Sequence, residues 1–277
     1  MAPKKINTLF VCLLLTLLCN TINAQAPKDN FYDRYLHKEK RTLPYNHVHE
    51  RDVFWEKRIW REIVVDEKMN HAFKNEKMPL INILLEAARS QEIAAYSTID
   101  DRFSERLSAE EARNLGVTID TVIICFDDFD DFNSMEPQVV RNELNPEDVK
   151  KFRLKEVWYF DEATSQMNVR ILGIAPIVSR YDDNGNYLNE GPMFWTYYPE
   201  LRSVLAKHEV SNAVNDATAM TWEDVFEARL FSSYITKESN AFNNRIKDVK
   251  KSPMAALLEA DKIKNTHLNM EHDLWSY

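Results

Sequence analysis

The first segment with regularly spaced apolar residues has the period of a helix. Trp55 and Ile59 lie four positions apart, and Trp60 and Ile63 extend the apolar pattern. Side chains with this spacing share one side of a helix, so the pattern predicts a helix over residues 49–64.

Two further helices are predicted in the first half of the chain. Residues 79–89 are mostly apolar and begin with Pro79, a residue that is favoured in the first turn of a helix. Ser108 is followed three positions later by Glu111, which is the spacing of a capping box, and Gly116 provides a stop signal. A short helix is therefore expected between Ser108 and Gly116.

The middle of the chain has the composition of strands, which are rich in β-branched and aromatic residues. The predicted strands are 118–126, 154–161, 166–180 and 192–198. Asn184-Gly185, within residues 181–186, predicts a hairpin turn, because both residue types tolerate positive φ. Asn145 followed by Pro146 predicts the start of another short helix. The predicted strands are expected to form an antiparallel meander.

Two helices are predicted near the C-terminal end. Thr221 and Asp224 have the spacing of a helix cap, and this helix is expected to run to about residue 234. Ser252-Pro253 starts the last helix, which is expected to run to about residue 274. Residues 49–277 are predicted to form a single α+β domain, in which helices flank the antiparallel sheet.

Residues 1–24 have the order of a secretory signal peptide. Lys4 and Lys5 are followed by an apolar run, and Ala24 provides a small residue at the cleavage site. Lipidation of Cys19 is the alternative, although Leu18 is larger than the residue that usually precedes a lipidated cysteine. The chain is therefore expected in an envelope compartment, and polar residues 25–48 are predicted to form a flexible lead segment.

Composition narrows the classes of ligand. The net charge of −9 becomes −11 without the two lysines of the signal, and an acidic surface disfavours nucleic acid and anionic lipid. Cys125 is the only cysteine after residue 24, so no disulfide within the mature chain is expected. The four glycines lie too far apart for the phosphate-binding loops of nucleotide-binding folds, and no cofactor is predicted.

An acidic cluster follows the predicted strand 118–126. It contains Asp127, Asp128, Asp130 and Asp131, and several carboxylates close together are the kind of ligand set that Ca²⁺ takes. The segment lacks the glycine and the glutamate that an EF-hand loop requires at fixed positions. A solvated acidic loop is the alternative interpretation.

Catalytic chemistry has little support in the sequence. His47 and His49 could chelate a metal, and His267 lies four residues before Glu271, but no HExxH motif or cysteine pair accompanies them. There is no GxSxG motif, and Cys125 lies within a predicted buried strand. No catalytic residue is therefore predicted.

Aromatic residues provide the candidates for a partner interface. Trp55, Arg58 and Trp60 are close in sequence, and Trp275 lies near the C-terminal end. Tryptophan and arginine are enriched among interface hot spots, and packing in the core is the alternative. On a helix, Trp55 and Trp60 would point in different directions, so one is expected in the core and the other exposed or at an interface.

Eight short segments, taken in order, resemble a known family. They are WEKRIWR (55–61), EKMN (67–70), WYFD (158–161), VRILGIAP (169–176), PMFW (192–195), FSSYI (231–235), KESN (237–240) and EHDLW (271–275). The ordered set is similar to the GldN/PorN family of gliding motility and type IX secretion components of Bacteroidota.

The resemblance implies a periplasmic structural subunit that is associated with the outer membrane through a partner, and not an enzyme. Members of the family assemble with an outer-membrane lipoprotein, GldK/PorK, into large rings, and are linked to the GldM/PorM motor component. The resemblance implies no catalytic residues, and no contact residues transfer to this chain by motif. Some relatives extend with a polar tail beyond the position of Tyr277.

Two other functions remain open from the residues alone. A periplasmic hydrolase acting on peptidoglycan is the first alternative, because exported proteins meet this substrate and paired carboxylates can cleave glycans. A Ca²⁺-responsive binding module is the second, and it depends on the cluster of residues 127–131.

Overall fold

The structure, a computed structural model, describes residues 40–75, 78–125, 135–181, 186–210 and 220–275. Within these ranges, the side chains of residues 119–125, 135–140, 180–181, 271 and 274–275 are left undescribed. All the described residues belong to one unit, Leu36–Tyr277. The predicted signal peptide and residues 25–39 of the predicted lead segment lie outside the described residues.

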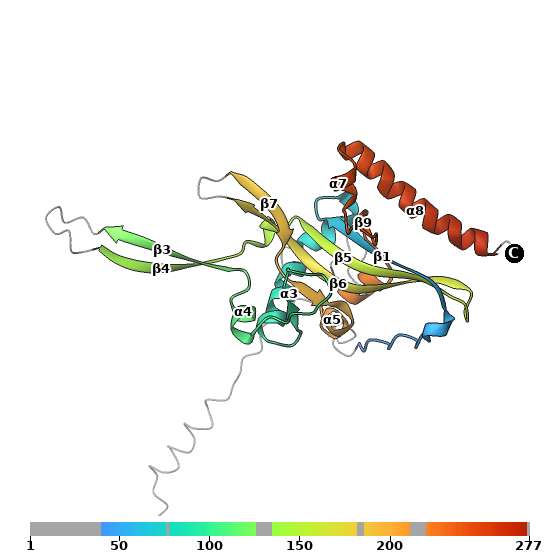
Figure 1. Cartoon of the computed structure of the whole chain (residues 1–277). Helices are drawn as coiled ribbons and strands as arrows, with labels where there is room; N and C mark the ends of the chain where they lie inside the picture. Colours follow the sequence, from blue (N-terminus) through green and yellow to red (C-terminus); the bar gives the residue numbers. More distant parts are fainter. Residues whose placement is uncertain (1–39, 76–77, 126–134, 182–185, 211–219, 276–277) are drawn as a thin grey trace, which may run out of the picture. The chain divides into compact units, whose positions relative to one another are not determined.

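The centre of the fold is a sheet of seven strands whose neighbours run antiparallel (Figure 1). Its longest strands are β1 (Val53–Val64), β5 (Lys151–Asp161) and β6 (Gln166–Tyr181), with β5 in the middle. The shorter strands are β2 (Ala95–Tyr96), β7 (Tyr187–Pro192), β8 (Trp195–Tyr197) and β9 (Tyr234–Glu238). The strand order is β2-β8-β6-β5-β1-β9, and β7 pairs with a separate part of β6.

A second, two-stranded sheet consists of β3 (Val117–Cys125) and β4 (Met135–Glu143). β3 confirms a strand at the position predicted from residues 118–126, while the burial of its side chains lies outside what is described. Together with the helices, the two sheets confirm the predicted α+β class.

The predicted helix over residues 49–64 is wrong. After a short 3-10 helix, η2 (Glu50–Asp52), the segment is strand β1, which pairs with β5 along almost its whole length. β9 pairs with the second half of β1, and residues 59–63 are all buried. A strand that is buried on both faces loses the alternation of period two. Its run of tryptophan and isoleucine therefore has apolar residues at helical spacings by coincidence.

The predicted strands 154–161 and 166–180 are confirmed as β5 and β6, and β8 lies within the predicted strand 192–198, but β7 was not predicted. β7 (Tyr187–Pro192) pairs with the end of β6 directly after the predicted turn. Pro192 has no N–H to donate to a ladder, which accounts for the end of β7. β8 then pairs with Gly173 and Ile174, further back along β6.

Helices α3 (Leu80–Arg89), α4 (Ala109–Arg113) and α8 (Pro253–Trp275) confirm three predictions. The Ser108 hydroxyl accepts the N–H of Glu111, and the Glu111 carboxylate accepts the N–H of Ser108, which is the predicted capping box. Gly116, shortly after α4, has a φ of +70°, a conformation that favours glycine. Asn145 caps a short 3-10 helix, η4 (Pro146–Asp148).

Helix α6 (Trp222–Glu227) is shorter than predicted. The predicted cap is present, because the N–H of Asp224 donates to the Thr221 hydroxyl and the Asp224 carboxylate accepts the N–H of Thr221. The chain leaves the helix at Arg229, whose φ is +55°. Tyrosine, isoleucine and threonine then favour a strand, and β9 begins at Tyr234.

The main core lies between one side of the large sheet and helices α3, α5 (Tyr198–Leu205) and α6. A second cluster joins α8 to the sheet through Ile59, Trp158, Ile235 and Ala260. The remaining short helices are η3 (Lys68–Lys74) and α7 (Ile246–Val249). Within the described ranges, no helix has both the length and the apolarity that crossing a bilayer requires.

Candidate functional site

Three of the four predicted interface residues lie on β1. Side chains alternate along a strand, so Trp55 lies on the side of Ile59, while Arg58 and Trp60 lie on the opposite side. Trp60 is 6% exposed, Trp55 is half-buried and Arg58 is exposed. The different burial of the two tryptophans follows from their positions in a strand and not from the helix that was expected. Trp275 belongs to α8, and its side chain is not described.

An aromatic cluster packs α8 against the sheet. The ring centroid of His267 lies 5.2 Å from that of Trp55 and 5.8 Å from that of Trp158. Its Nε2 atom is 3.5 Å from a carboxylate oxygen of Glu238. Burial lowers the pKa of His267, Glu238 opposes this effect, and Lys57 adds to it. The buried imidazole of His267 therefore packs against two indoles, and its burial disfavours the protonated form.

Most of the candidate metal ligands fall outside what the structure describes. Residues 127–131 lie outside the described ranges, and the side chains of Cys125 and Glu271 are not described. The rings of His47 and His49 lie 4.6 Å apart. In the described part of the chain, no group of three histidine, cysteine or acidic side chains is arranged to hold a metal ion.

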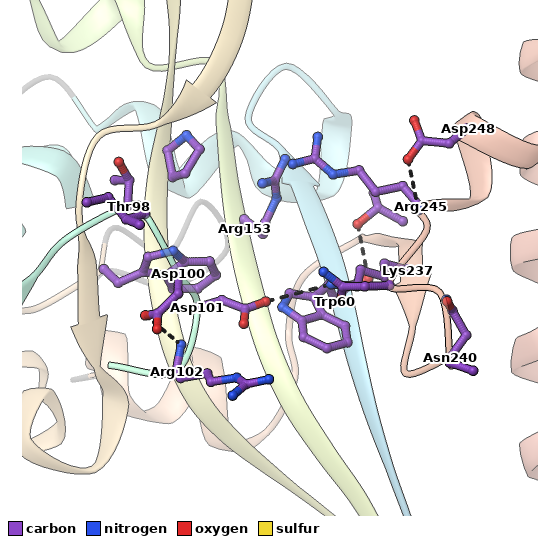
Figure 2. Close-up of a pocket in the computed structure, with 16 residues that line it drawn as sticks. Trp60, Thr98, Asp100, Asp101, Arg102, Arg153, Lys237, Asn240, Arg245 and Asp248 are labelled. Carbon is purple, nitrogen blue, oxygen red and sulfur yellow. Dashed lines mark hydrogen bonds and ion pairs between the residues drawn. The ribbon is translucent and has the colours of Figure 1, made fainter. Parts of the chain in front are cut away.

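A cavity of about 710 Å³ lies on the side of the sheet that carries Trp60 (Figure 2). Strands β1, β5, β8 and β9 contribute to it, together with the loops at residues 98–102 and 240–245. Its main charged and aromatic lining residues are Trp60, Asp101, Arg153, Trp195, Lys237 and Arg245.

The loop that carries Asp101 is fixed to the sheet by Phe103. The Phe103 ring packs edge-on against three aromatic rings, those of Tyr96, Trp195 and Tyr197. It also covers Gly173 on β6, where an added Cβ would lie 2.5 Å from the Phe103 ring. Only glycine permits this close approach, so Gly173 helps to position the wall of the cavity.

Two buried lysines share the carboxylate of Asp101. The Nζ atoms of Lys155 and Lys237 lie 3.7 Å and 3.9 Å from its oxygens. Lys155 also donates a hydrogen bond to the backbone carbonyl of Asp101. Lys237 lies 4.0 Å from the centre of the Trp60 ring, a cation–π contact. Burial lowers the pKa of both lysines, and Asp101 opposes the effect.

Two arginines add positive charge to the same cavity. The Arg153 guanidinium donates to the Glu62 carboxylate at 2.6 and 3.1 Å. Arg245 is half-buried, and among the described residues no carboxylate forms an ion pair with it. Figure 2 shows the guanidinium ends of Arg153 and Arg245 pointing toward one another.

The start of the described chain contacts α5 and α6. The Nζ atom of Lys40 donates to the Thr221 hydroxyl at 2.9 Å. The Tyr45 hydroxyl donates to the Glu227 carboxylate at 2.6 Å, and the Tyr45 ring lies 4.2 Å from the guanidinium carbon of Arg202. Burial and Glu227 together raise the pKa of the Tyr45 hydroxyl. Residues 40–45 therefore contact the helices through specific polar bonds.

Sequence reasoning did not find the cavity residues Lys155, Lys237 and Arg245. A weak signal is present for Lys155, which lies within the predicted strand 154–161, whereas no strand was predicted around Lys237. No comparable signal marks Arg245, which reaches the cavity from a loop before α7.

The fold and the site define an α+β protein with a mixed-charge cavity on one side of its sheet and a C-terminal helix packed through aromatic rings. A family model described as gliding motility associated protein GldN matches residues 48–276, which is most of the chain. The chain therefore belongs to the GldN family, as the ordered segments indicate. This family is associated with gliding motility and is not a known enzyme family. No curated protein matches the chain.

Proposed function

We propose that this protein is a structural subunit of the type IX protein secretion and gliding motility machinery. In this proposal it forms a periplasmic ring with an outer-membrane lipoprotein of the GldK/PorK type. A GldM/PorM-like motor component is its second partner. The observation that carries the proposal is the match to the GldN family over residues 48–276.

The sequence before the matched region supports a periplasmic location. Residues 1–24 have a basic head, an apolar run and a small residue at the expected cleavage site. The mature chain keeps a single cysteine, so its stability in an oxidising compartment must come from the packed core and not from an internal disulfide. The large aromatic core is consistent with this requirement.

A ring of identical subunits needs two different contact faces on each copy. Helix α8 offers surface for one of them, because its Ala260 side is packed on the sheet while other apolar side chains are exposed. These exposed side chains are Met254, Leu257, Leu258 and Leu268. Apolar side chains that gather on an exposed element are typical of interaction surfaces, so α8 is a candidate docking element in the assembly.

The proposal is tested by deleting the gene and restoring it. The deletion strain should lose gliding and should retain type IX cargo inside the cell, and the wild-type chain should restore both. Export of an unrelated periplasmic protein through the general secretion route serves as the control and should stay normal. Normal cargo export in the deletion strain would contradict the proposal.

The alternative of a peptidoglycan hydrolase is tested separately with purified, folded protein in a cell-wall gel. The structural role predicts no clearing zone beside a lysozyme control that clears. A reproducible zone that disappears on substitution of single carboxylates would replace the structural role with an enzymatic one.

A further inference from the structure

The cavity on the Trp60 side of the sheet has an excess of positive charge. Five cationic side chains line it or lie directly beside it: Arg102, Arg153, Lys155, Lys237 and Arg245. In the described part of the chain, these five have two carboxylate partners in ion pairs, Glu62 on Arg153 and Asp101 on the two lysines. Each lysine is near the limit of ion-pair distance from Asp101, so the compensation is incomplete.

The other two carboxylates at the cavity are bonded within their own loops. Asp248 accepts the backbone N–H of Arg245 at 3.0 Å. Asp100 accepts the backbone N–H of Arg102 at 3.2 Å and the Ser104 hydroxyl at 2.7 Å. These two carboxylates therefore have hydrogen-bond donors of their own, although both still line the cavity.

Lys237 is a buried cation whose only ion pair in the described part of the chain is long. It is 9% exposed, and among the described residues its ammonium group donates no hydrogen bond. Its Nζ atom is 3.9 Å from a carboxylate oxygen of Asp101 and 4.0 Å from the centre of the Trp60 ring. A buried ammonium group without an acceptor is unfavourable, and an oxygen atom of a ligand would supply that acceptor.

Arg245 offers the second set of donors. Its guanidinium group is planar and can give two parallel hydrogen bonds to a carboxylate. Its charge lies close enough to Lys237 to lower the pKa of that lysine, which places both cations around one region of the cavity. An anion between them would relieve this repulsion.

We propose that the cavity binds a carboxylate group presented by a peptide segment of a partner protein, with Lys237 and Arg245 contacting its oxygens. The indole rings of Trp60 and Trp195 supply apolar walls for the carbon atoms of the peptide. The Thr236 hydroxyl donates to the backbone carbonyl of Trp60 at 3.2 Å, and its oxygen can still accept a hydrogen bond from a peptide N–H.

The size and the charge of the cavity favour a peptide over a single small ion. Its volume of about 710 Å³ lies within the range of roughly 300–1,000 Å³ that is usual for ligand sites. Phosphate carries up to two negative charges, and Asp100 and Asp248 line the same cavity and would repel it more than they repel a carboxylate. The carboxylate can come from an acidic side chain or from the free C-terminus of a chain.

The indole N–H of Trp60 provides a direct reporter, because its Nε1 atom is buried and has no hydrogen-bond partner in the described part of the chain. The full exported chain is labelled with ¹⁵N, and the signal of Trp60 among the six tryptophans is assigned with Trp60→Phe. Four probes are titrated at constant ionic strength. They are acetyl-Gly-Asp-Gly-amide, acetyl-Gly-Gly-Gly with a free C-terminus, the neutral acetyl-Gly-Asn-Gly-amide and inorganic phosphate.

Saturable shifts of the Trp60 signal are expected with at least one carboxylate peptide, at a Kd of roughly 1 mM or below, which corresponds to about −4.1 kcal/mol. The peptide that binds more tightly identifies the source of the carboxylate. Arg245→Gln and Lys237→Gln should each weaken binding about tenfold, which corresponds to about 1.4 kcal/mol. Lys247→Gln is the matched control, because this exposed lysine lies two residues from Arg245 and does not line the cavity.

Three results would overturn the proposal. The first is the absence of a saturable shift with both carboxylate peptides. The second is equal binding of the neutral peptide, or binding of phosphate alone. The third is an unchanged affinity of Arg245→Gln for the carboxylate peptides. Arg245 is half-buried and has no ion pair among the described residues, so this variant should keep the melting temperature of the wild type.

Discussion

Truncation of Trp60 to alanine is expected to destabilise the protein strongly. The side chain is 6% exposed and packs with Ala175 and Trp195 under the ammonium group of Lys237. A buried aromatic side chain removes roughly 150–250 Å² from water, and at about 25 cal/mol per Å² this corresponds to about 4–6 kcal/mol. Alanine retains part of that area, and truncations of buried aromatic residues usually cost about 3–5 kcal/mol, which is the loss we expect.

The assay is thermal unfolding of matched variants. For a domain of this length, 1 kcal/mol changes Tm by about 2–4 °C, so Trp60→Ala should lower Tm by roughly 6–20 °C. Trp55→Ala removes the same residue type from the same strand, but this side chain is only half-buried. Its loss in Tm should therefore be clearly smaller, because less apolar area leaves water when Trp55 folds.

The two variants together test the strand assignment of β1. Equal Tm values for Trp60→Ala and the wild type would refute the burial of Trp60. A larger decrease in Tm for Trp55→Ala than for Trp60→Ala would mean that Trp55, and not Trp60, is the more buried side chain. Either result would also remove the aromatic wall from the proposed peptide site.

Three further substitutions have expected outcomes. Arg229→Ala removes the guanidinium that bonds the fully buried Glu156 at 2.8 Å and leaves this carboxylate with the Trp158 indole N–H at 3.1 Å, so the loss in urea unfolding should be up to about 3–5 kcal/mol. The pKa of His267 is lowered in the folded state, so the unfolded chain binds a proton more readily at this residue. The free energy of unfolding should therefore decrease as the pH falls from the usual pKa of about 6.5 to the lowered pKa of the folded state. His267→Gln should flatten this part of a stability–pH profile. Tyr45→Phe loses the hydrogen bond to Glu227 and should cost about 1 kcal/mol.

Each of these expectations has an opposing result. A loss below about 1 kcal/mol for Arg229→Ala would mean that water or another cation compensates Glu156. A stability–pH profile of His267→Gln parallel to that of the wild type would show that His267 does not titrate with unfolding. Unchanged unfolding of Tyr45→Phe would mean that residues 40–45 do not contribute to the stability of the helices.

The sequence predicted well those features of the fold that depend on neighbouring residues, such as helix caps. The caps at Ser108 and Thr221, and the proline at the start of α8, depend on residues a few positions apart, and the structure has all three. β5 and β6 were also predictable, because a long run of β-branched and aromatic residues has little alternative to a strand.

The elements that were predicted wrongly or missed are those whose secondary structure depends on contacts with distant parts of the chain. β1 is central in the sheet and buried on both sides over residues 59–63, so its pattern contains no clear alternation. The early end of α6 depends on the positive φ of Arg229, which sequence spacing does not reveal. Strand β7 is exposed over much of its length, and it lacks the apolar pattern that identifies a buried strand.

The charged cavity could not be predicted, because its residues are far apart in the chain. Asp101, Lys155 and Lys237 come from a loop and two strands, and only the order β6-β5-β1-β9 brings them together. Trp60 was predicted as an interface candidate from its residue type, and the structure places it in the wall of this cavity. Its role in binding a partner stays a prediction.

A structural role in the secretion and motility machinery requires specific protein partners, so the decisive measurement is to identify what the protein contacts in the envelope. Cells producing the tagged chain are cross-linked, the envelope is solubilised in detergent, and the captured proteins are identified by mass spectrometry. A GldK/PorK-like lipoprotein and further copies of this chain should be captured together with the tagged protein. Neither should be captured from control cells that are not cross-linked and whose envelope assembly has been disrupted. Efficient capture of the tagged chain from the periplasm without that lipoprotein would contradict it.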